Sequence, residues 1–254
     1  MDTKNIKVIW SADNIPKADL CRILGSEAFP RERVAIKLDR LFLTIYGLNS
    51  ISEIQQQFNI PVFADAKIIE VPSKVLEITK LHLEHQPWML NVMAGACNTW
   101  KSPDSQGVKD EKQYDLLYHF ADLCSTAGTL SCAVTVLTSK TPQAVSSEYN
   151  CTAKVAVIDY ARLMEDCSLT DIVCSPQEAT ALIEDDCHLS INTPGVRLPG
   201  SNKDDQSRIT TPHDAFASGV ERIVVGRDIY RKGENYDVII PNIQKIFANI
   251  EGRD

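Results

Sequence analysis

Residues 62–72 read VFADAKIIEVP, and this stretch decides the fold. The apolar run Val62–Ala66 is typical of a buried strand, and the stretch Pro72–Glu84 that follows has the spacing of a helix. Pro72 stands in the first turn of that helix, a position where proline is favoured. The segment therefore predicts one strand followed by one helix, which is the repeating unit of a parallel α/β fold.

The same unit recurs along the chain on both sides of this stretch. Short apolar runs with the length of buried strands alternate with helical spacing, such as the apolar stripe of Tyr114–Ser125. The predicted strands are Val8–Ala12, Val34–Leu38, Val62–Ala66, Met89–Val92, Cys132–Leu137, Asp171–Cys174, Leu189–Asn192 and Arg222–Val225. The other predicted helices are Ile51–Phe58, Lys154–Glu165, Gln177–Ile183 and Ile240–Ile250. Eight such units predict a (β/α)₈ (TIM) barrel, and we expect residues 1–254 to form it as a single domain.

The composition limits what the protein binds. The 254 residues carry a formal net charge of −8 and the sequence pI is about 5.2, so we expect no binding to nucleic acid or to an anionic membrane. The longest apolar runs, such as Val238–Ile240, are far too short to span a bilayer. The first residues, MDTKNIKVIW, contain no signal-peptide core, so we expect a cytoplasmic protein.

The strand at residues 62–66 leads into an unusual run of charges, Asp65-x-Lys67-x-x-Glu70. Alternation along a strand places Asp65 and Lys67 on one face, and at the C-terminal end of a barrel strand that face opens into the mouth. Opposite charges at such a place stabilise each other's ionised forms. A surface salt bridge, or an acid placed at the start of a helix in the case of Glu70, would use the same residues, so the motif alone leaves both interpretations open.

A second group of polar residues follows the last two predicted strands. Phosphate sites of (β/α)₈ barrels are often formed by the loops after strands seven and eight. Gly226 lets backbone amides approach an anion there, with Arg227 beside it. The group comprises Thr193–Arg197, Asp205–Arg208 and Val224–Asp228. These residues predict a phosphate site, and the polar stretches Thr99–Glu111 and Arg197–Thr211 predict loops at the same end of the barrel, the second a candidate lid.

Taken together, these segments resemble the orotidine 5′-monophosphate decarboxylases, and in detail the bacterial form of that family. The segments that carry the resemblance are Val8–Asp13, Ala35–Leu38, Asp65–Lys74, Val134–Ser139, Val173–Glu178, Thr193–Arg197, Gln206 and Gly226–Arg227. They occur in the family's order, and Asp65–Lys74 stands where the family carries D-x-K-x-x-D-I-P-x-T. The resemblance implies decarboxylation of orotidine 5′-monophosphate to UMP in pyrimidine synthesis, with no metal and no cofactor.

The resemblance also implies a role for each matching residue. Lys67 would be the proton donor and Asp65 would press against the substrate carboxylate, while Asp13 and Lys37 would contact the ribose and complete the charge network. Thr138 and Ser139 would face the pyrimidine. The residues that would hold the phosphate are Arg197, Gln206, Gly226 and Arg227. In the family the final acid of the motif reaches into the neighbouring subunit's site, which implies a homodimer with shared active sites; here that acid is Glu70.

Three positions depart from the family's pattern. Glu70 replaces an Asp, Lys74 stands at the substrate-binding position where the family has a Thr bonding the ribose, and Met93 stands where many members place a His. One added methylene can displace a charge by about an ångström, and a displacement of that size can cost about a hundredfold in rate. These departures leave open a nucleotide-binding paralogue that has lost the reaction, or a decarboxylase turned to an altered nucleotide.

A further alternative is a metal-dependent enzyme similar to the 3-keto-gulonate-6-phosphate decarboxylases and hexulose phosphate synthases, which share the D-x-K-x-x-D motif and the fold. Their metal is held partly by an acid in the second strand, whereas this chain has Lys37 there. Because a lysine argues against a cation site, our leading hypothesis is the metal-independent decarboxylation of orotidine 5′-monophosphate.

Overall fold

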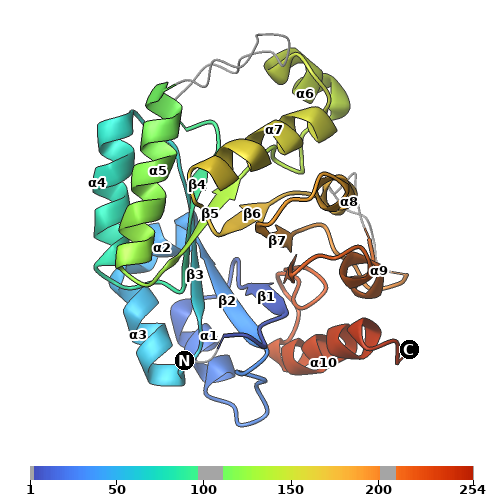
Figure 1. Ribbon diagram of the computed structural model, residues 1–254. Helices are drawn as coiled ribbons and strands as arrows, with labels where there is room; N and C mark the ends of the chain where they lie inside the picture. The colour runs from blue at the N-terminus through green and yellow to red at the C-terminus, as the bar shows by residue number, and fades with distance from the viewer. Residues whose placement is uncertain (1–2, 97–110, 201–209, 254) are drawn as a thin grey trace.

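The computed structural model describes residues 3–96, 111–200 and 210–253, and their strands form a closed parallel barrel in chain order (Figure 1). The strands are β1 (Val8–Ser11), β2 (Val34–Asp39), β3 (Val62–Ile68), β4 (Met89–Met93), β5 (Leu130–Val134), β6 (Asp171–Val173), β7 (Ser190–Thr193) and β8 (Arg222–Val225). The barrel closes where β8 pairs with β1 in parallel, with Ile223 opposite Val8. The predicted (β/α)₈ barrel is confirmed.

Helices cover the outside of the barrel. They are α1 (Lys17–Leu24), α2 (Arg40–Tyr46), α3 (Asn49–Phe58), α4 (Pro72–Leu83), α5 (Glu111–Thr126), α6 (Pro142–Tyr149), α7 (Ala153–Asp166), α8 (Pro176–Glu184), α9 (Pro212–Ala217), the short 3₁₀ helix η1 (Tyr236–Val238) and α10 (Ile239–Ile250). In Figure 1, α2 to α5 lie on one side of the strands, and α8 and α9 lie on the other. Proline in the first turn and a threonine cap begin several of them; at α6, for example, Thr141 Oγ1 accepts from Ala144 N.

Alternate residues of each strand divide between two cores. Trp10 and Ile36 point outward and pack under the helices in the larger core, whereas Ile9, Ala35 and Phe63 point into the barrel and form a smaller core there. This alternation is the period of two expected for a strand. It fixes which side chains of each strand reach the barrel mouth.

Two features differ from the sequence-based predictions. The fifth strand runs from Leu130 to Val134 rather than from Cys132 to Leu137, because the chain leaves the sheet at Thr135, whose hydroxyl donates to Val173 O at 2.9 Å. Four helices, α1, α2, α6 and α9, were not predicted. The helix α2 begins directly after β2 and is apolar around most of its circumference, so it has no one-sided apolar stripe to reveal it.

The two predicted polar loops, Thr99–Glu111 and Arg197–Thr211, lie largely outside the described residues. Within residues 3–96, 111–200 and 210–253, no helix is both long enough and apolar enough to cross a bilayer.

Candidate active site

Six strands bring a side chain to the barrel mouth by the same rule. Two positions beyond an inward-pointing core residue, each of these strands places a residue that lines a cavity of about 660 Å³. The core residues are Ile9, Ala35, Phe63, Met89, Cys132 and Val224. The cavity residues that follow them are Ser11, Lys37, Asp65, Asn91, Val134 and Gly226. The cavity is therefore a direct continuation of the barrel core toward the C-terminal ends of the strands, where the active sites of this fold lie.

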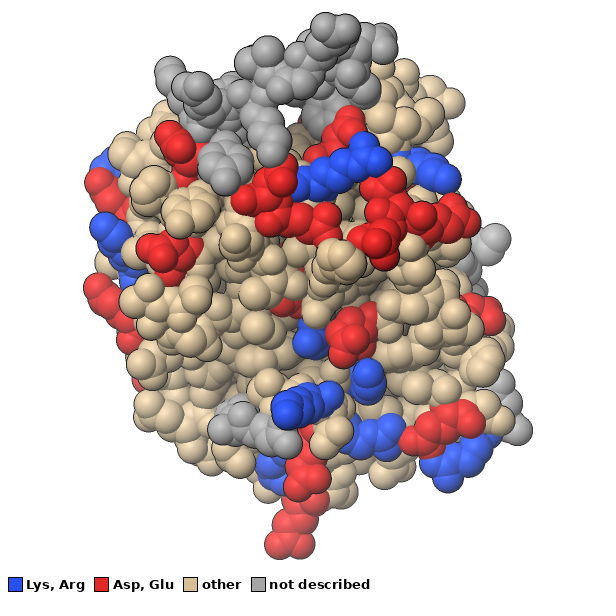
Figure 2. Space-filling model, viewed as in Figure 1, with Lys and Arg blue, Asp and Glu red and all other residues tan. Residues whose placement is uncertain are grey.

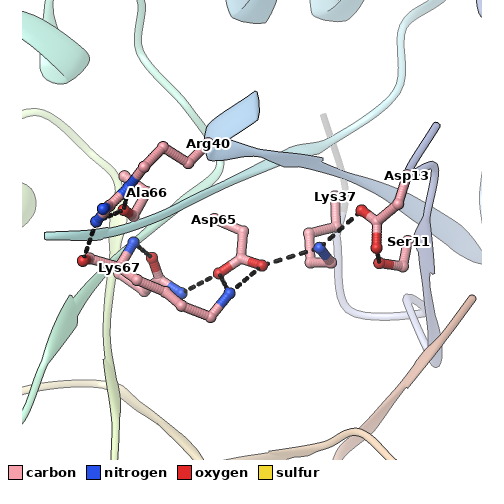
Figure 3. A network of polar contacts seen from close by, with 8 residues as sticks. Ser11, Asp13, Lys37, Arg40, Asp65, Ala66 and Lys67 are labelled. Carbon is pink, nitrogen blue, oxygen red and sulfur yellow. Dashed lines mark hydrogen bonds and ion pairs between the residues drawn. The ribbon is translucent and has the colours of Figure 1, made fainter. Parts of the chain in front are cut away.

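A row of alternating charges crosses the floor of this cavity (Figure 3). Lys37 Nζ lies 2.8 Å from Asp65 Oδ2 and 3.1 Å from Asp13 Oδ1. Lys67 Nζ lies 2.6 Å from both carboxylate oxygens of Asp65, as the strand alternation predicts for these two residues. At the other end of the row, Ser11 Oγ donates to Asp13 Oδ2 at 2.8 Å. The order Asp13, Lys37, Asp65, Lys67 places a negative charge between two positive ones.

The charges of this row hold each other ionised. Burial alone would lower the pKa of the Lys37 ammonium, but the carboxylates of Asp65 and Asp13 outweigh burial and raise the pKa above its ordinary value. Burial alone would raise the pKa of the Asp65 carboxyl, but the ammonium groups of Lys37 and Lys67 outweigh burial and hold this pKa well below its ordinary value. Asp65 and Lys37 are therefore charged at neutral pH although both are buried.

Asn91 on β4 belongs to this site, and the sequence analysis did not single it out. Its side-chain amide donates to Asp65 Oδ1 at 2.7 Å, and its carbonyl oxygen accepts from the Lys67 backbone N at 2.7 Å. Lys67 has a φ of 43°, which is uncommon for a residue other than glycine, so Asn91 holds both the backbone of Lys67 and the carboxylate next to it. The sequence did contain one indication of this role: Asn91 stands two residues beyond Met89, and alternation along a strand places the two side chains on the same face.

Arg40, the first residue of α2, supports the same segment from outside the cavity. Its guanidinium donates to Ala66 O at 2.7 and 2.9 Å and to Lys67 O at 2.5 Å. Figure 3 shows this guanidinium on the carbonyl side of the strand end, while the Lys67 side chain turns toward Asp65. The unusual backbone of Lys67 is thus held by side chains of its two neighbouring elements, α2 and β4.

The cavity has an apolar wall and a basic end. The apolar side chains that line it are Phe63, Val134, Val136, Leu137, Val173 and Val224. Thr138 also lines the cavity, next to Leu137. The loops after β7 and β8 form the basic end with Gly195, Arg197, Gly226 and Arg227. Such a cavity can pack a flat ring against its wall while its basic end holds an anion.

Arg197 is buried at this basic end and forms an ion pair with Asp228. Its Nε lies 3.6 Å from Asp228 Oδ1, and its Nη1 donates to Val196 O at 2.8 Å. Asp228 Oδ2 accepts from Leu198 N at 2.6 Å. Arg197 therefore braces the loop after β7 against the loop after β8, in addition to lining the cavity. Gln206, the other predicted phosphate contact of this loop, lies outside the described residues.

Three predicted site residues lie away from the cavity in this single chain. Ser139 is exposed in the turn after β5. Lys74 is exposed on α4 and pairs with Glu77 at 2.6 Å. Glu70 is exposed before α4, where its Oε1 accepts from Val71 N at 2.9 Å. Among the described residues, no cluster of three or more His, Cys, Asp or Glu side chains is placed to hold a metal ion.

The fold and the cavity together define a class of protein: a (β/α)₈ barrel with a row of fixed charges at its mouth and a basic end at the usual phosphate position. Comparison with known proteins gives the family. Residues 7–238 match the model of the Orotidine 5′-phosphate decarboxylase / HUMPS family. The chain belongs to this family, which confirms the resemblance seen in its sequence.

Several curated proteins named orotidine 5′-phosphate decarboxylase are similar to this chain. One from Staphylococcus aureus (strain Mu3) is 34% identical over 191 residues, which are 72% of this chain and 74% of the relative. One from Syntrophomonas wolfei is 33% identical over 200 residues, 77% of this chain and 79% of the relative. One from Chromobacterium violaceum is 33% identical over 175 residues, 68% of this chain and 65% of the relative.

A solved structure agrees on the fold. The crystal structure of orotidine 5′-phosphate decarboxylase from Lactobacillus acidophilus matches with a TM-score of 0.72 and 23% identity, covering 95% of this chain and 99% of that one. An orotidine 5′-phosphate decarboxylase is a carboxy-lyase, so the predicted membership of a carboxy-lyase family is confirmed.

Proposed function

We propose that the protein decarboxylates orotidine 5′-monophosphate to UMP, the last step that supplies UMP in pyrimidine synthesis. The observation that carries this proposal is the buried Asp65 carboxylate between Lys37 Nζ at 2.8 Å and Lys67 Nζ at 2.6 Å, at the mouth of a barrel of this family. The names of the curated relatives support the same activity. A single functional domain over residues 1–254 and a cytoplasmic location, both expected from the sequence, are part of the proposal.

Lys67 is the proposed proton donor. Loss of CO₂ breaks the bond between C6 of the pyrimidine and the carboxylate carbon, and the electron pair stays on C6 as a vinylic carbanion that the ring stabilises poorly. The Lys67 ammonium stabilises this carbanion electrostatically and then transfers a proton to C6. The Lys67 side chain is 39% exposed in the open cavity, whereas that of Lys37 is 9% exposed and lies behind Asp65. Both lysines line the cavity, and Lys67 is the more exposed of the two.

Asp65 has the complementary role. Its carboxylate is buried and accepts hydrogen bonds from Lys37, Lys67 and Asn91, so solvent does not screen its charge. A substrate carboxylate placed beside it is repelled in the bound ground state, and part of that repulsion is relieved as neutral CO₂ departs. The proposed catalysis thus depends on charges that the fold has fixed before the substrate arrives.

The basic end of the cavity is the proposed phosphate site. Gly226 and Arg227 line it after β8 and Arg197 lines it after β7; Gln206 keeps the phosphate-binding role that the sequence implies. Asp13, which lines the cavity and pairs with Lys37, is the proposed ribose contact, and Thr138 is the proposed pyrimidine contact. Binding the phosphate far from C6 supplies energy that can position the reacting ring against Asp65 and Lys67.

A homodimer with shared sites is part of the proposal, and it accounts for the position of Glu70. The neighbours of Glu70 in sequence, Ile69 and Val71, are 55% and 56% exposed, and Leu41 and Ile45 on α2 are 58% and 61% exposed. A groove of about 270 Å³ lies between α2, the end of β3 and α4, and Ile69 lines it. Exposed apolar side chains of this size favour burial against another surface. A second copy would bury them and carry Glu70 and Lys74 toward the neighbouring cavity.

The metal-dependent alternative is disfavoured by the place that Lys37 occupies. Its ammonium lies between the carboxylates of Asp13 and Asp65, where a divalent cation would need to sit. A lysine in that position supplies the positive charge itself and blocks the metal. The family model includes the HUMPS branch, so the two reactions need a direct test.

The test is turnover of orotidine 5′-monophosphate by the pure protein, followed as loss of the orotate absorbance and as release of CO₂. We expect conversion to UMP at a rate that dialysis against a chelator leaves unchanged. A rate lost with chelator and restored by magnesium would contradict the metal-independent reaction, and absence of turnover without added magnesium would call for the sugar-phosphate substrates to be tested. A folded protein that binds UMP and converts no substrate would favour the paralogue that has lost the reaction.

A further inference from the structure

A second depression adjoins the phosphate end of the cavity. It has a volume of about 340 Å³, and Arg227, Arg231 and Lys245 are among the residues that line it. Arg227 and Arg231 also line the main cavity, so they form the boundary between the two spaces. The proposed function uses only Arg227 of these three cations.

The two arginines lie in and directly after a single turn that follows β8. Ile229 N and Tyr230 N both donate to Gly226 O, at 2.9 and 3.0 Å, which closes a single turn over residues 226–230. Arg227 lies within this turn and Arg231 directly follows it, and both line the same two spaces.

The helix α10 contributes the third cation. Asn242 on α10 lies in the depression and donates through Nδ2 to Ile229 O at 3.2 Å, which ties the helix to the turn. Its Oδ1 accepts from Lys245 Nζ at 3.4 Å. Lys245 is thereby held at the depression, opposite the turn that carries Arg227 and Arg231.

Two acids also line the depression, and both are engaged by the backbone. Asp228 is buried and accepts from Leu198 N at 2.6 Å, with Arg197 Nε at 3.6 Å. Glu234 accepts from Arg231 N at 2.9 Å. With Arg197 counted against Asp228, the described residues that line the depression carry three cations and one further acid, Glu234, in a chain whose net charge is −8. Figure 2 shows several Lys and Arg side chains, with Asp and Glu side chains among them, in the lower middle of the visible face, below a band of Asp and Glu.

We propose that this depression binds a second phosphate group, next to the place of the 5′-phosphate, so that the protein binds pyrimidine nucleoside 5′-diphosphates as well as monophosphates. The inference rests on the proposed function, because it takes the 5′-phosphate to lie at Gly226 and Arg227. Arginine and lysine side chains that converge on one space are the groups that recognise phosphate. The second phosphate comes either from the β-position of a nucleotide or from a free phosphate ion, and the two sources are separable by experiment.

The experiment is calorimetric titration of UMP, of UDP, and of inorganic phosphate into the UMP-saturated protein, at one fixed salt concentration. Wild-type protein is expected to bind UDP about tenfold more tightly than UMP, the size of one good charge-assisted hydrogen bond. Lys245→Gln should reduce this advantage, and Arg231→Gln combined with Lys245→Gln should abolish it. Because Lys245 lines only the depression, Lys245→Gln should leave the affinity for UMP and the turnover of orotidine 5′-monophosphate unchanged.

A matched control is Lys154→Gln, which makes the same charge change at an exposed position on α7; it should keep the full UDP advantage. If UDP binds no more tightly than UMP, but phosphate binds the UMP-saturated wild type and not the double variant, the second phosphate is a free ion. If neither UDP preference nor phosphate binding is found, or if both survive in the double variant, the inference is wrong. Turnover of orotidine 5′-monophosphate is measured separately, so a UDP preference without turnover contradicts only the proposed function.

Discussion

At the scale of single residues, the site depends on a buried charge that neighbouring charges make tolerable. Removing an ammonium or a carboxylate from water costs several kcal/mol unless a partner compensates, and Asp65 compensates Lys37 at 2.8 Å. Strand alternation predicted Asp65 beside Lys67, whereas Lys37 entered the charge network only through the family resemblance. Neither predicted Asn91, because an asparagine in a strand indicates a site only when its neighbour in the barrel is known.

Replacing Asp65 by Asn preserves the shape and removes the charge between Lys37 and Lys67. At pH 7 we expect the free energy of unfolding to fall by about 3 kcal/mol, because a buried ammonium loses its counter-ion. The pKa of Asp65 is lower in the folded protein than in the unfolded chain, so its contribution is present above about pH 4 and is lost as the pH falls toward the folded-state pKa.

The difference in unfolding free energy between wild type and Asp65→Asn should therefore be constant between about pH 6 and 8 and shrink below about pH 4. Denaturant titrations of both proteins across this range measure it. A difference that widens toward acid pH would mean that the folded state raises the pKa of Asp65 instead.

At the scale of elements, the site lies where β3 departs from regular geometry. The register between β3 and β4 shifts between Ala64 and Ile68, and Lys67 within this interval has a φ of 43°. Such a backbone costs of order 1–3 kcal/mol and persists only where its surroundings hold it. Here Arg40 of α2 and Asn91 of β4 hold it. The hydrophobic pattern predicted the strand, but no local pattern predicts this irregular end, because it depends on contacts with two other elements.

Asn91→Ala tests whether this junction positions Lys67. The variant leaves Lys67 N without its partner and removes one of the two donors to Asp65 Oδ1. We therefore expect the unfolding free energy to fall by about 2 kcal/mol and kcat to fall by about a hundredfold. The matched control is Asn192→Ala. Asn192 is equally buried on β7, but its amide bonds Asp171 at the first residue of β6, away from the cavity. The Asn192→Ala variant should lower the free energy of unfolding and leave kcat nearly unchanged. Equal losses of kcat in the two variants would show that Asn91 acts through stability alone.

At the scale of the whole molecule, strand order and barrel closure followed from the alternation of strands and helices, because sequential parallel strands with covering helices have few ways to close. The predicted positions of Asp65, Lys67 and the loops after β7 and β8 rested on the same geometry, whereas those of Asp13 and Lys37 rested on the family resemblance. Glu70 and Lys74 could not be assigned in this way. In one chain both are exposed and outside the cavity, so the role that the resemblance implies for them depends on the proposed second chain.

Subunit exchange tests that requirement. We expect a Lys67→Ala chain and a Glu70→Ala chain each to be inactive alone, and to form heterodimers in which one site carries both changes and the other carries neither. Activity should return to up to about half the wild-type rate per dimer if the two sites are independent. The measurement is turnover of orotidine 5′-monophosphate before and after mixing, with exchange verified by native mass spectrometry.

If exchange is verified and no activity returns, Glu70 serves its own chain or no site at all. If Glu70→Ala alone keeps full activity, the acid has been lost from the mechanism, which would favour the divergent paralogue.

The central claim is that Lys67 supplies the proton to C6, and the kcat of Lys67→Ala tests it most directly. We expect kcat to fall by about a thousandfold or more, because a positioned proton donor and a fixed positive charge are removed together. Affinity for UMP and the unfolding transition should remain close to wild type. Lys140→Ala, which removes a lysine near the mouth but outside the main cavity, should keep the wild-type rate. A Lys67→Ala protein that retains most of the wild-type kcat would contradict the account.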